Sequence, residues 1–182
     1  MLLAVAVVLA ASEPRVWLEA GLGPAGAPAE EFGGGVSFNG AVAVVLGAHP
    51  ERAVGLVARG RETTMTADLR QIGSISFLLR YPSDTGPYVH LGFAHNHESP
   101  MADFLARPGA SFAAVDRAIT HRTGFEVGFG YDWAPPFPKH PMTEHLRPRM
   151  DVGIVVLPDR GGPPVYVVIE GGLRFGLDRL FG

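Results

Sequence analysis

The residues best suited to chemistry lie at the end of one segment, Val89 to Ser99, which reads V-H-L-G-F-A-H-N-H-E-S. Residues two apart share a face of a β-strand, so an apolar row on this segment is continued by His95, His97 and Ser99. Histidine supplies general bases and metal ligands, and a serine hydroxyl becomes a nucleophile when a base lies beside it. The end of this segment is therefore the first candidate for a functional site.

Metal binding is one chemistry that this spacing allows. His95 and His97, at i and i+2 on one strand face, could share a metal ion, with His121 or Glu98 as a third ligand. The chain has no cysteine, and the pattern does not define the third ligand. We therefore assign no metal site and expect no cofactor.

The composition suits strands separated by turns. Of the 182 residues, 24 are Gly and 16 are Pro, and only 18% are charged, against about 25% in an average domain. A net charge of −3 provides no basic surface, so no nucleic-acid partner is expected. The absence of cysteine excludes a disulfide framework and thiol catalysis.

The amino terminus has the features of a signal peptide. Met1 to Ala11 is apolar, and Ala10-Ala11-Ser12 is an acceptable small-residue cleavage site. We expect residues 1–12 to be a signal peptide and residues 13–182 to form one domain. The alternative for the first segment is a buried strand. No later run reaches the roughly 18 apolar residues of a transmembrane helix.

Alternation with period two predicts eight β-strands. They are expected within residues 15–23, 36–49, 54–61, 74–81, 89–99, 125–133, 149–156 and 165–177. Residues 62–70, 100–110 and 134–148 are expected to be loops, and residues 111–117 could form a short turn of helix. The fold class is therefore all-β.

The second face of these strands decides the kind of β protein. It carries charges of both signs among small residues, while the first face is almost continuously apolar; the charged residues are Glu19, Arg59, Arg61, Arg80, Glu126, Asp132, Arg149, Asp151, Glu170 and Arg174. This pattern predicts an eight-stranded antiparallel transmembrane β-barrel of the outer-membrane type, apolar outside and charged inside. A soluble sandwich is the alternative, and a lipocalin-like barrel would reverse the polarity.

Aromatic residues at the expected strand ends fit the membrane prediction. Trp17, Tyr81, Tyr131 and Trp133 lie where the aromatic girdles of such barrels are found. The chain ends in Phe181-Gly182, whereas outer-membrane barrels usually end in an aromatic residue.

The segment from His97 to Gly109, H-E-S-P-M-A-D-F-L-A-R-P-G, resembles the outer-membrane lipid A deacylases. These are eight-stranded barrels with an H-x-S-N motif on the outside of the barrel at its outer rim. The resemblance implies that His97 is the general base and Ser99 the nucleophile. Pro100 stands where the family has an Asn that helps to bind the oxyanion.

The resemblance also implies an orienting carboxylate and a lipid substrate. Glu126 is the nearest equivalent of the family's orienting Glu, but its parity points inward, so a bulge at Thr123 to Phe125 would have to turn it outward. In this hypothesis Phe93 borders the acyl chain, His95 belongs to the substrate site, and Arg107 pairs with a lipid phosphate.

The resulting expectation is a monomeric barrel in the bacterial outer membrane that hydrolyses an acyl ester of lipid A or a phospholipid. The alternative is a non-enzymatic structural or binding barrel, which Pro100 favours because proline has no N–H to replace the missing oxyanion donor. In that case His97 and Ser99 are ordinary polar residues at the membrane rim.

Overall fold

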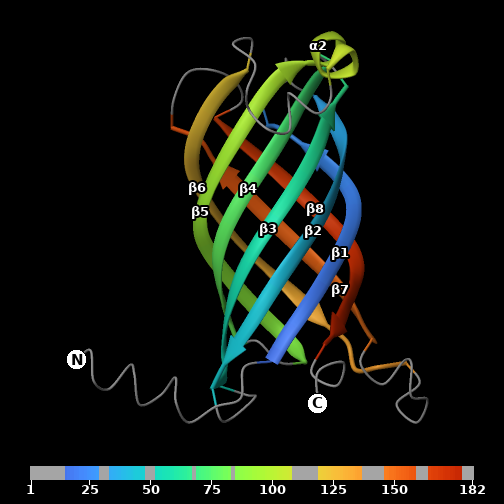
Figure 1. Cartoon of the computed structure of the whole chain (residues 1–182), viewed down its shortest axis with the longest axis vertical. Coiled ribbons are helices and arrows are strands. Elements are labelled where there is room, and N and C mark those ends of the chain that lie inside the picture. Colours follow the sequence, from blue (N-terminus) through green and yellow to red (C-terminus); the bar gives the residue numbers. More distant parts are fainter. Residues whose placement is uncertain are drawn as a thin grey trace.

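The computed structural model describes residues 15–28, 33–47, 52–66, 69–82, 85–107, 119–136, 146–158 and 164–177. The strands are β1 Arg15–Gly26, β2 Gly34–Leu46, β3 Val54–Met65, β4 Arg70–Tyr81, β5 Gly86–Pro100, β6 Thr120–Asp132, β7 Leu146–Val156 and β8 Val165–Gly176. They form one closed antiparallel barrel in chain order, and β8 pairs with β1 (Figure 1). The predicted eight-stranded antiparallel barrel is confirmed.

A six-residue helix, α2 Met101–Ala106, follows β5 at one end of the barrel (Figure 1). Residues 100–110 are predicted to be loop from the sequence, and this prediction is wrong for residues 101–106. The helix begins directly after Pro100, its N-cap residue, which has extended backbone angles. Within the described ranges, no helix is both long and apolar enough to cross a membrane.

The stretch 62–70 was also expected to be loop, and this prediction is wrong for most of its length. β3 continues to Met65 and β4 begins at Arg70, and these two residues are register partners. The polar residues of this stretch are typical of a loop, but Glu62 and Thr64 lie on the outward face of a strand that continues.

β7 likewise begins at Leu146, inside the predicted loop 134–148. The predicted signal peptide and the possible helical turn at 111–117 lie outside the described residues.

Side chains alternate between the outside and the inside of the barrel along every strand. On β5, for example, Leu91 is 57% exposed whereas His90 is buried. The charged face points inward as predicted, and Arg80, Glu126 and Arg174 are among the most buried side chains. An apolar exterior around a polar interior is the arrangement that a barrel in lipid requires.

The interior is less uniformly charged than the sequence suggested. Two apolar clusters occupy it, one toward the α2 end and one toward the opposite end. The first contains Ala25, Met65, Ile72, Ala94, Val155, Leu157, Tyr166 and Val168, and the second contains Trp17, Ala41, Ala43, Val45, Ala53, Val57 and Leu78. The buried charges lie between and beside these clusters.

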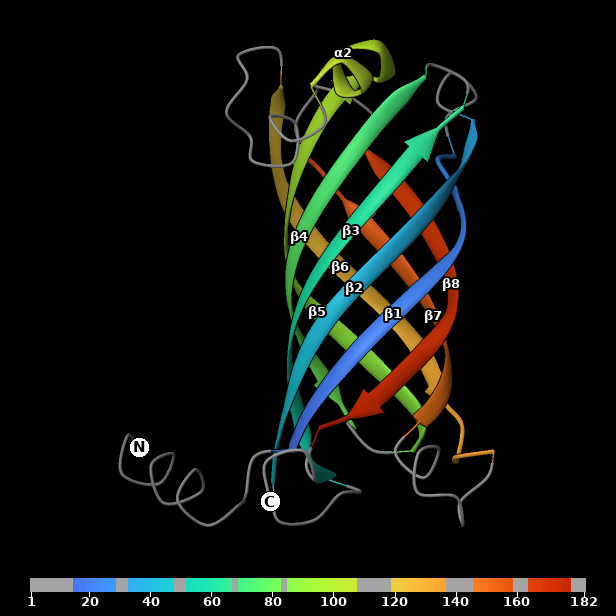
Figure 2. The ribbon, with the colours of Figure 1, turned by 45° about the vertical axis from the view of Figure 1, so that its right-hand side comes forward.

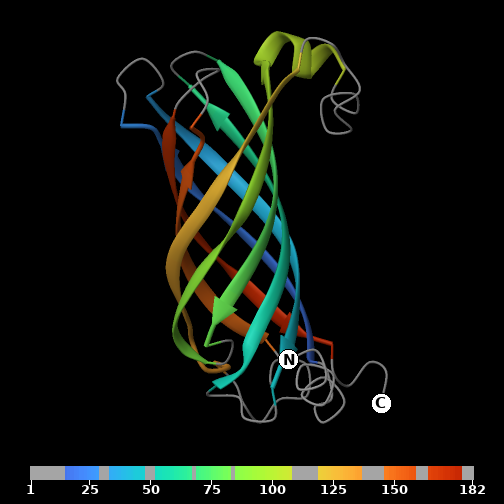
Figure 3. The ribbon, with the colours of Figure 1, turned by 90° about the vertical axis from the view of Figure 1, so that its left-hand side faces the viewer.

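The two ends of the barrel differ in their aromatic residues. β1 begins and β8 ends at the end opposite α2 (Figures 2 and 3). Tyr81, Tyr131 and Trp133 are outward-facing at that end, as a girdle requires, and the last two rings lie 5.1 Å apart. The prediction that Trp17 belongs to a girdle is wrong. Its side chain is buried inside the barrel, with the guanidinium groups of Arg147 and Arg174 over its ring.

The outward face becomes polar toward the α2 end on β3 to β6. We call this region the polar rim; it consists of Glu62, Thr64, Gln71, His95, His97, Ser99, His121 and Thr123. Below it, the same face carries large apolar side chains such as Phe77, Phe93 and Phe125. The apolar belt therefore ends at the polar rim on this side of the barrel.

The height of the belt can be tested on β5 alone. In a phospholipid bilayer, Leu91→Arg puts a charge on the apolar belt and should cost about 2–4 kcal/mol of unfolding free energy, whereas His97→Arg, on the same face within the polar rim, should cost about 0–1 kcal/mol. Reversible urea unfolding in phospholipid vesicles measures both. Equal losses of unfolding free energy in the two variants would show that the apolar belt does not end at the polar rim.

Candidate functional site

His95 and His97 lie on the outward face of β5, as predicted, and a third histidine joins them. His97 is the register partner of His121 on β6. The ring centroids of His95 and His97 are 4.7 Å apart, those of His97 and His121 4.9 Å, and those of His95 and His121 5.5 Å. His121 Nδ1 lies 3.4 Å from His95 Nε2. The strand register thus gathers three imidazoles at the polar rim.

Ser99 lies on the same face as His97, one pleat closer to α2, but it is only 5% exposed. Its register partner is Gln71 on β4. Within the described residues, no hydrogen bond joins the Ser99 hydroxyl to the His97 ring. A serine nucleophile is activated by a base within hydrogen-bond reach, and this contact is not formed between Ser99 and His97 in the structure.

Glu126 points into the barrel, as its parity predicts, and the bulge that would turn it toward His97 does not occur. The β5–β6 register is continuous from Glu98↔Thr120 to Gly86↔Asp132, so the described strands have no bulge at Thr123 to Phe125. Glu126 is fully buried inside the barrel, where it accepts hydrogen bonds from Arg59, Arg61 and Ser76. The sheet wall separates it from the polar rim.

The remaining predicted site residues lie on the outside. Phe93 is exposed below His95 on β5, and Arg107 is exposed where α2 ends. The Arg107 backbone N–H donates to the carbonyl oxygens of Asp103 and Phe104. Pro100 is the last residue of β5.

A carboxylate at the polar rim was missed because its segment was expected to be loop. Glu62 accepts a hydrogen bond from Gln71 Nε2 at 2.7 Å, and Thr64 Oγ1 donates to Gln71 Oε1 at 2.6 Å. Glu62, Gly73, His97 and His121 occupy one cross-strand row. A Cβ at Gly73 would lie 3.1 Å from Glu62 Oε1, so the glycine leaves room for this carboxylate to lie across β4 toward β5.

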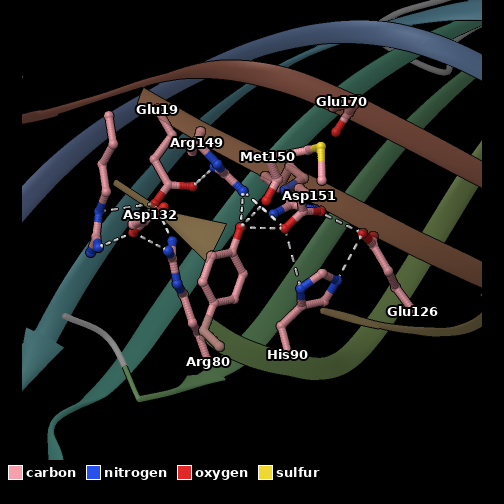
Figure 4. Close-up of polar contacts among 12 residues, drawn as sticks. Glu19, Arg80, His90, Glu126, Asp132, Arg149, Met150, Asp151 and Glu170 are labelled. Atoms are coloured by element: carbon pink, nitrogen blue, oxygen red, sulfur yellow. Dashed lines mark hydrogen bonds and ion pairs between the residues drawn. The ribbon is translucent and has the colours of Figure 1, made fainter. Parts of the chain in front are cut away.

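The interior contains a second constellation of titratable residues, centred on His90 (Figure 4). His90 Nε2 lies 3.6 Å from Glu126 Oε1, and His90 Nδ1 lies 3.5 Å from Asp151 Oδ2. Arg59 Nη1 bridges the same two carboxylates, at 2.8 Å and 3.2 Å. Arg61 also pairs with Glu126 and Arg149 with Asp151, and the positive charge of these guanidinium groups disfavours a metal cation there.

The buried charges continue toward the end opposite α2 as a chain of ion pairs. Glu19 accepts from Arg80 at 2.7 Å and is also paired with Arg149, while Asp132 accepts from Arg174 at 2.8 Å. Asp132 is also paired with Arg80. Such pairing is the condition under which ions can be removed from water.

Glycines on β6 make room for the bulky interior residues of β5. Gly128 faces His90, whose ring atoms would lie 2.6 Å from a Cβ at that position. Gly130 faces Tyr88 in the same way, at 2.3 Å. Tyr88 can therefore reach Asp151, to which its hydroxyl donates at 2.6 Å. The alternation of glycine with charged residues along these strands is a consequence of filling a narrow interior.

Comparison with known proteins supports the fold alone. The structure is similar to the crystal structure of Neisserial surface protein A, with a TM-score of 0.56 and 12% identity over 90% of this chain and 97% of that one. No protein-family model and no curated protein matches the chain. The chain is an eight-stranded barrel of the outer-membrane type, and the comparisons single out no catalytic family.

The interior ion pairs and the polar rim should respond differently to neutralisation of one carboxylate. Glu126→Gln breaks two buried ion pairs at once and leaves Arg59 with Asp151 and Arg61 with Glu170 as their remaining carboxylate partners. We therefore expect a loss of about 3–5 kcal/mol of unfolding free energy. Glu62→Gln, at the partly exposed rim, should cost about 0.5 kcal/mol or less. Urea unfolding of both variants in vesicles compares them, and a stable Glu126→Gln barrel would show that the interior pairs do not hold the fold.

Proposed function

We propose that this protein resides in the bacterial outer membrane as a non-enzymatic barrel that acts through its outward surface and its rim. The observation that carries the proposal is the filled interior. Eight strands enclose a space just wide enough for side chains. Buried arginines, carboxylates and two apolar clusters occupy this space among the described residues.

A filled interior argues against passage of solutes. Arg59 and Arg61 on β3 each donate a hydrogen bond across the lumen to Glu126 on β6, and breaking such buried pairs is costly. The longest connection between strands, from β5 to β6, lies at the α2 end. Long connections are typical of the extracellular side of these barrels, so we assign the α2 end and the polar rim to that side.

The filled interior predicts a protein without channel activity. The purified barrel, reconstituted into planar lipid bilayers, should give no single-channel steps under conditions where a porin in the same membrane conducts. Stable unitary conductance from the folded barrel would contradict the proposal, because ions would then have to pass the interior ion pairs.

An acyl-ester hydrolase resembling the lipid A deacylases is the second candidate. It is favoured by His97 and Ser99 on one outward face and by the Glu62 carboxylate in the same cross-strand row as His97. A nucleophile on the outside of a barrel can reach a lipid beside it in the membrane. In this candidate Glu62, in place of Glu126, is the carboxylate on the correct side to orient His97.

Fatty acid release distinguishes the two candidates. The folded barrel, incubated with lipid A or phospholipid, should release no fatty acid detectable by mass spectrometry if it is non-enzymatic. Release that is lost in Ser99→Ala and in His97→Ala, but kept in Thr123→Ala on the same face, would support the hydrolase instead. Release that persists in Ser99→Ala would come from a contaminant and would leave the non-enzymatic proposal standing.

A further inference from the structure

We propose that His95, His97 and His121 form a binding site for a late first-row divalent cation, with Zn²⁺ as the representative ion, on the outer surface of the barrel. Each histidine offers one ring nitrogen, and the three nitrogens lie within 4.8 Å of one another. This inference goes beyond the proposed function and replaces the expectation, drawn from the sequence, that the chain has no metal site.

The spacing of two ring nitrogens already matches a tetrahedral ion. With Zn–N bonds of 2.0–2.1 Å, two ligands at the tetrahedral angle are separated by about 3.4 Å. His121 Nδ1 and His95 Nε2 are 3.4 Å apart. The His97 ring is only partly buried and stands edge-on to both others, so it can turn to bring its nitrogen to the same point.

The ligand set determines the class of cation. Neutral imidazoles suit Zn²⁺, Cu²⁺ and Ni²⁺, whereas Ca²⁺ and Mg²⁺ require oxygen ligands. Three protein ligands leave one position of a tetrahedral ion for water or an external ligand. This position would face outward, because His121 is exposed.

The surroundings favour this group over the other combinations. Glu98, the alternative third ligand, points into the barrel and accepts hydrogen bonds from Arg70 and Arg122, each at 2.8 Å. Glu62 instead lies on the outward face, in the cross-strand row of His97 and His121. Its negative charge lowers the electrostatic cost of a cation there. The interior group around His90 lacks this advantage because guanidinium groups already pair with its carboxylates.

Zinc titration of the refolded full-length barrel tests the proposal. After EDTA treatment and buffer exchange, isothermal titration calorimetry in detergent with Zn²⁺ alone should show one equivalent bound. His95→Ala, His97→Ala and His121→Ala should each weaken binding at least about tenfold, since loss even of outer-shell partners costs 10–100-fold. Thr123 is the register partner of His95 and has no imidazole nitrogen. The control variant Thr123→Ala should therefore bind zinc as the wild type does.

Two further measurements separate loss of zinc binding from loss of folding. Gel mobility before and after heating identifies folded variants, and imidazole NMR of the wild type gives a measurement that needs no variant. Zinc should shift the ring signals of His95, His97 and His121 and leave that of His90 unchanged. The proposal is overturned if the folded wild type binds no zinc, if the three histidine variants bind it unchanged, or if zinc shifts only the signals of other histidines.

Discussion

Closure of the sheet is the constraint on which the rest of this structure depends. Within lipid every backbone N–H and C=O must be paired by the protein itself, and a sheet meets this condition only when its last strand returns to its first. The pairing of β8 with β1 does so here. Closure in turn divides every strand into a row on the outside of the barrel and an inward row facing a narrow space. The alternation in the sequence is the direct result.

The inward row explains both the glycines and the ion pairs. Eight strands leave little room, so Gly128 and Gly130 stand beside His90 and Tyr88. Charges in this space have lost most of their water and must therefore be paired. Such pairs contribute little net stability compared with apolar packing, but they specify register: a slip of one residue would turn Arg59 to the apolar outside of the barrel. We therefore interpret the network as a device that selects one strand alignment.

The parity of the strands could be predicted from the sequence because it depends only on neighbours along the chain. The limits of β3 and β4 could not, since polar residues such as Glu62 and Gln71 read as loop although they lie at the rim. Trp17 was misplaced because its position at a strand end says nothing about which side it faces. Which residues meet across strands depends on register. From the sequence, His121 was one of two candidates for a third metal ligand, and only the strand register of the structure shows that it lies beside His97.

The geometry of the polar rim makes hydrolysis and metal binding compete for one residue. As the base for Ser99, His97 needs a ring nitrogen with a lone pair directed at the serine hydroxyl. As a metal ligand, it directs that lone pair toward His95 and His121. The ring contacts at 4.7 and 4.9 Å put His97 among the other histidines, while Ser99 is buried beside it without a hydrogen bond to its ring. The same arrangement that weakens the hydrolase candidate therefore favours the metal site.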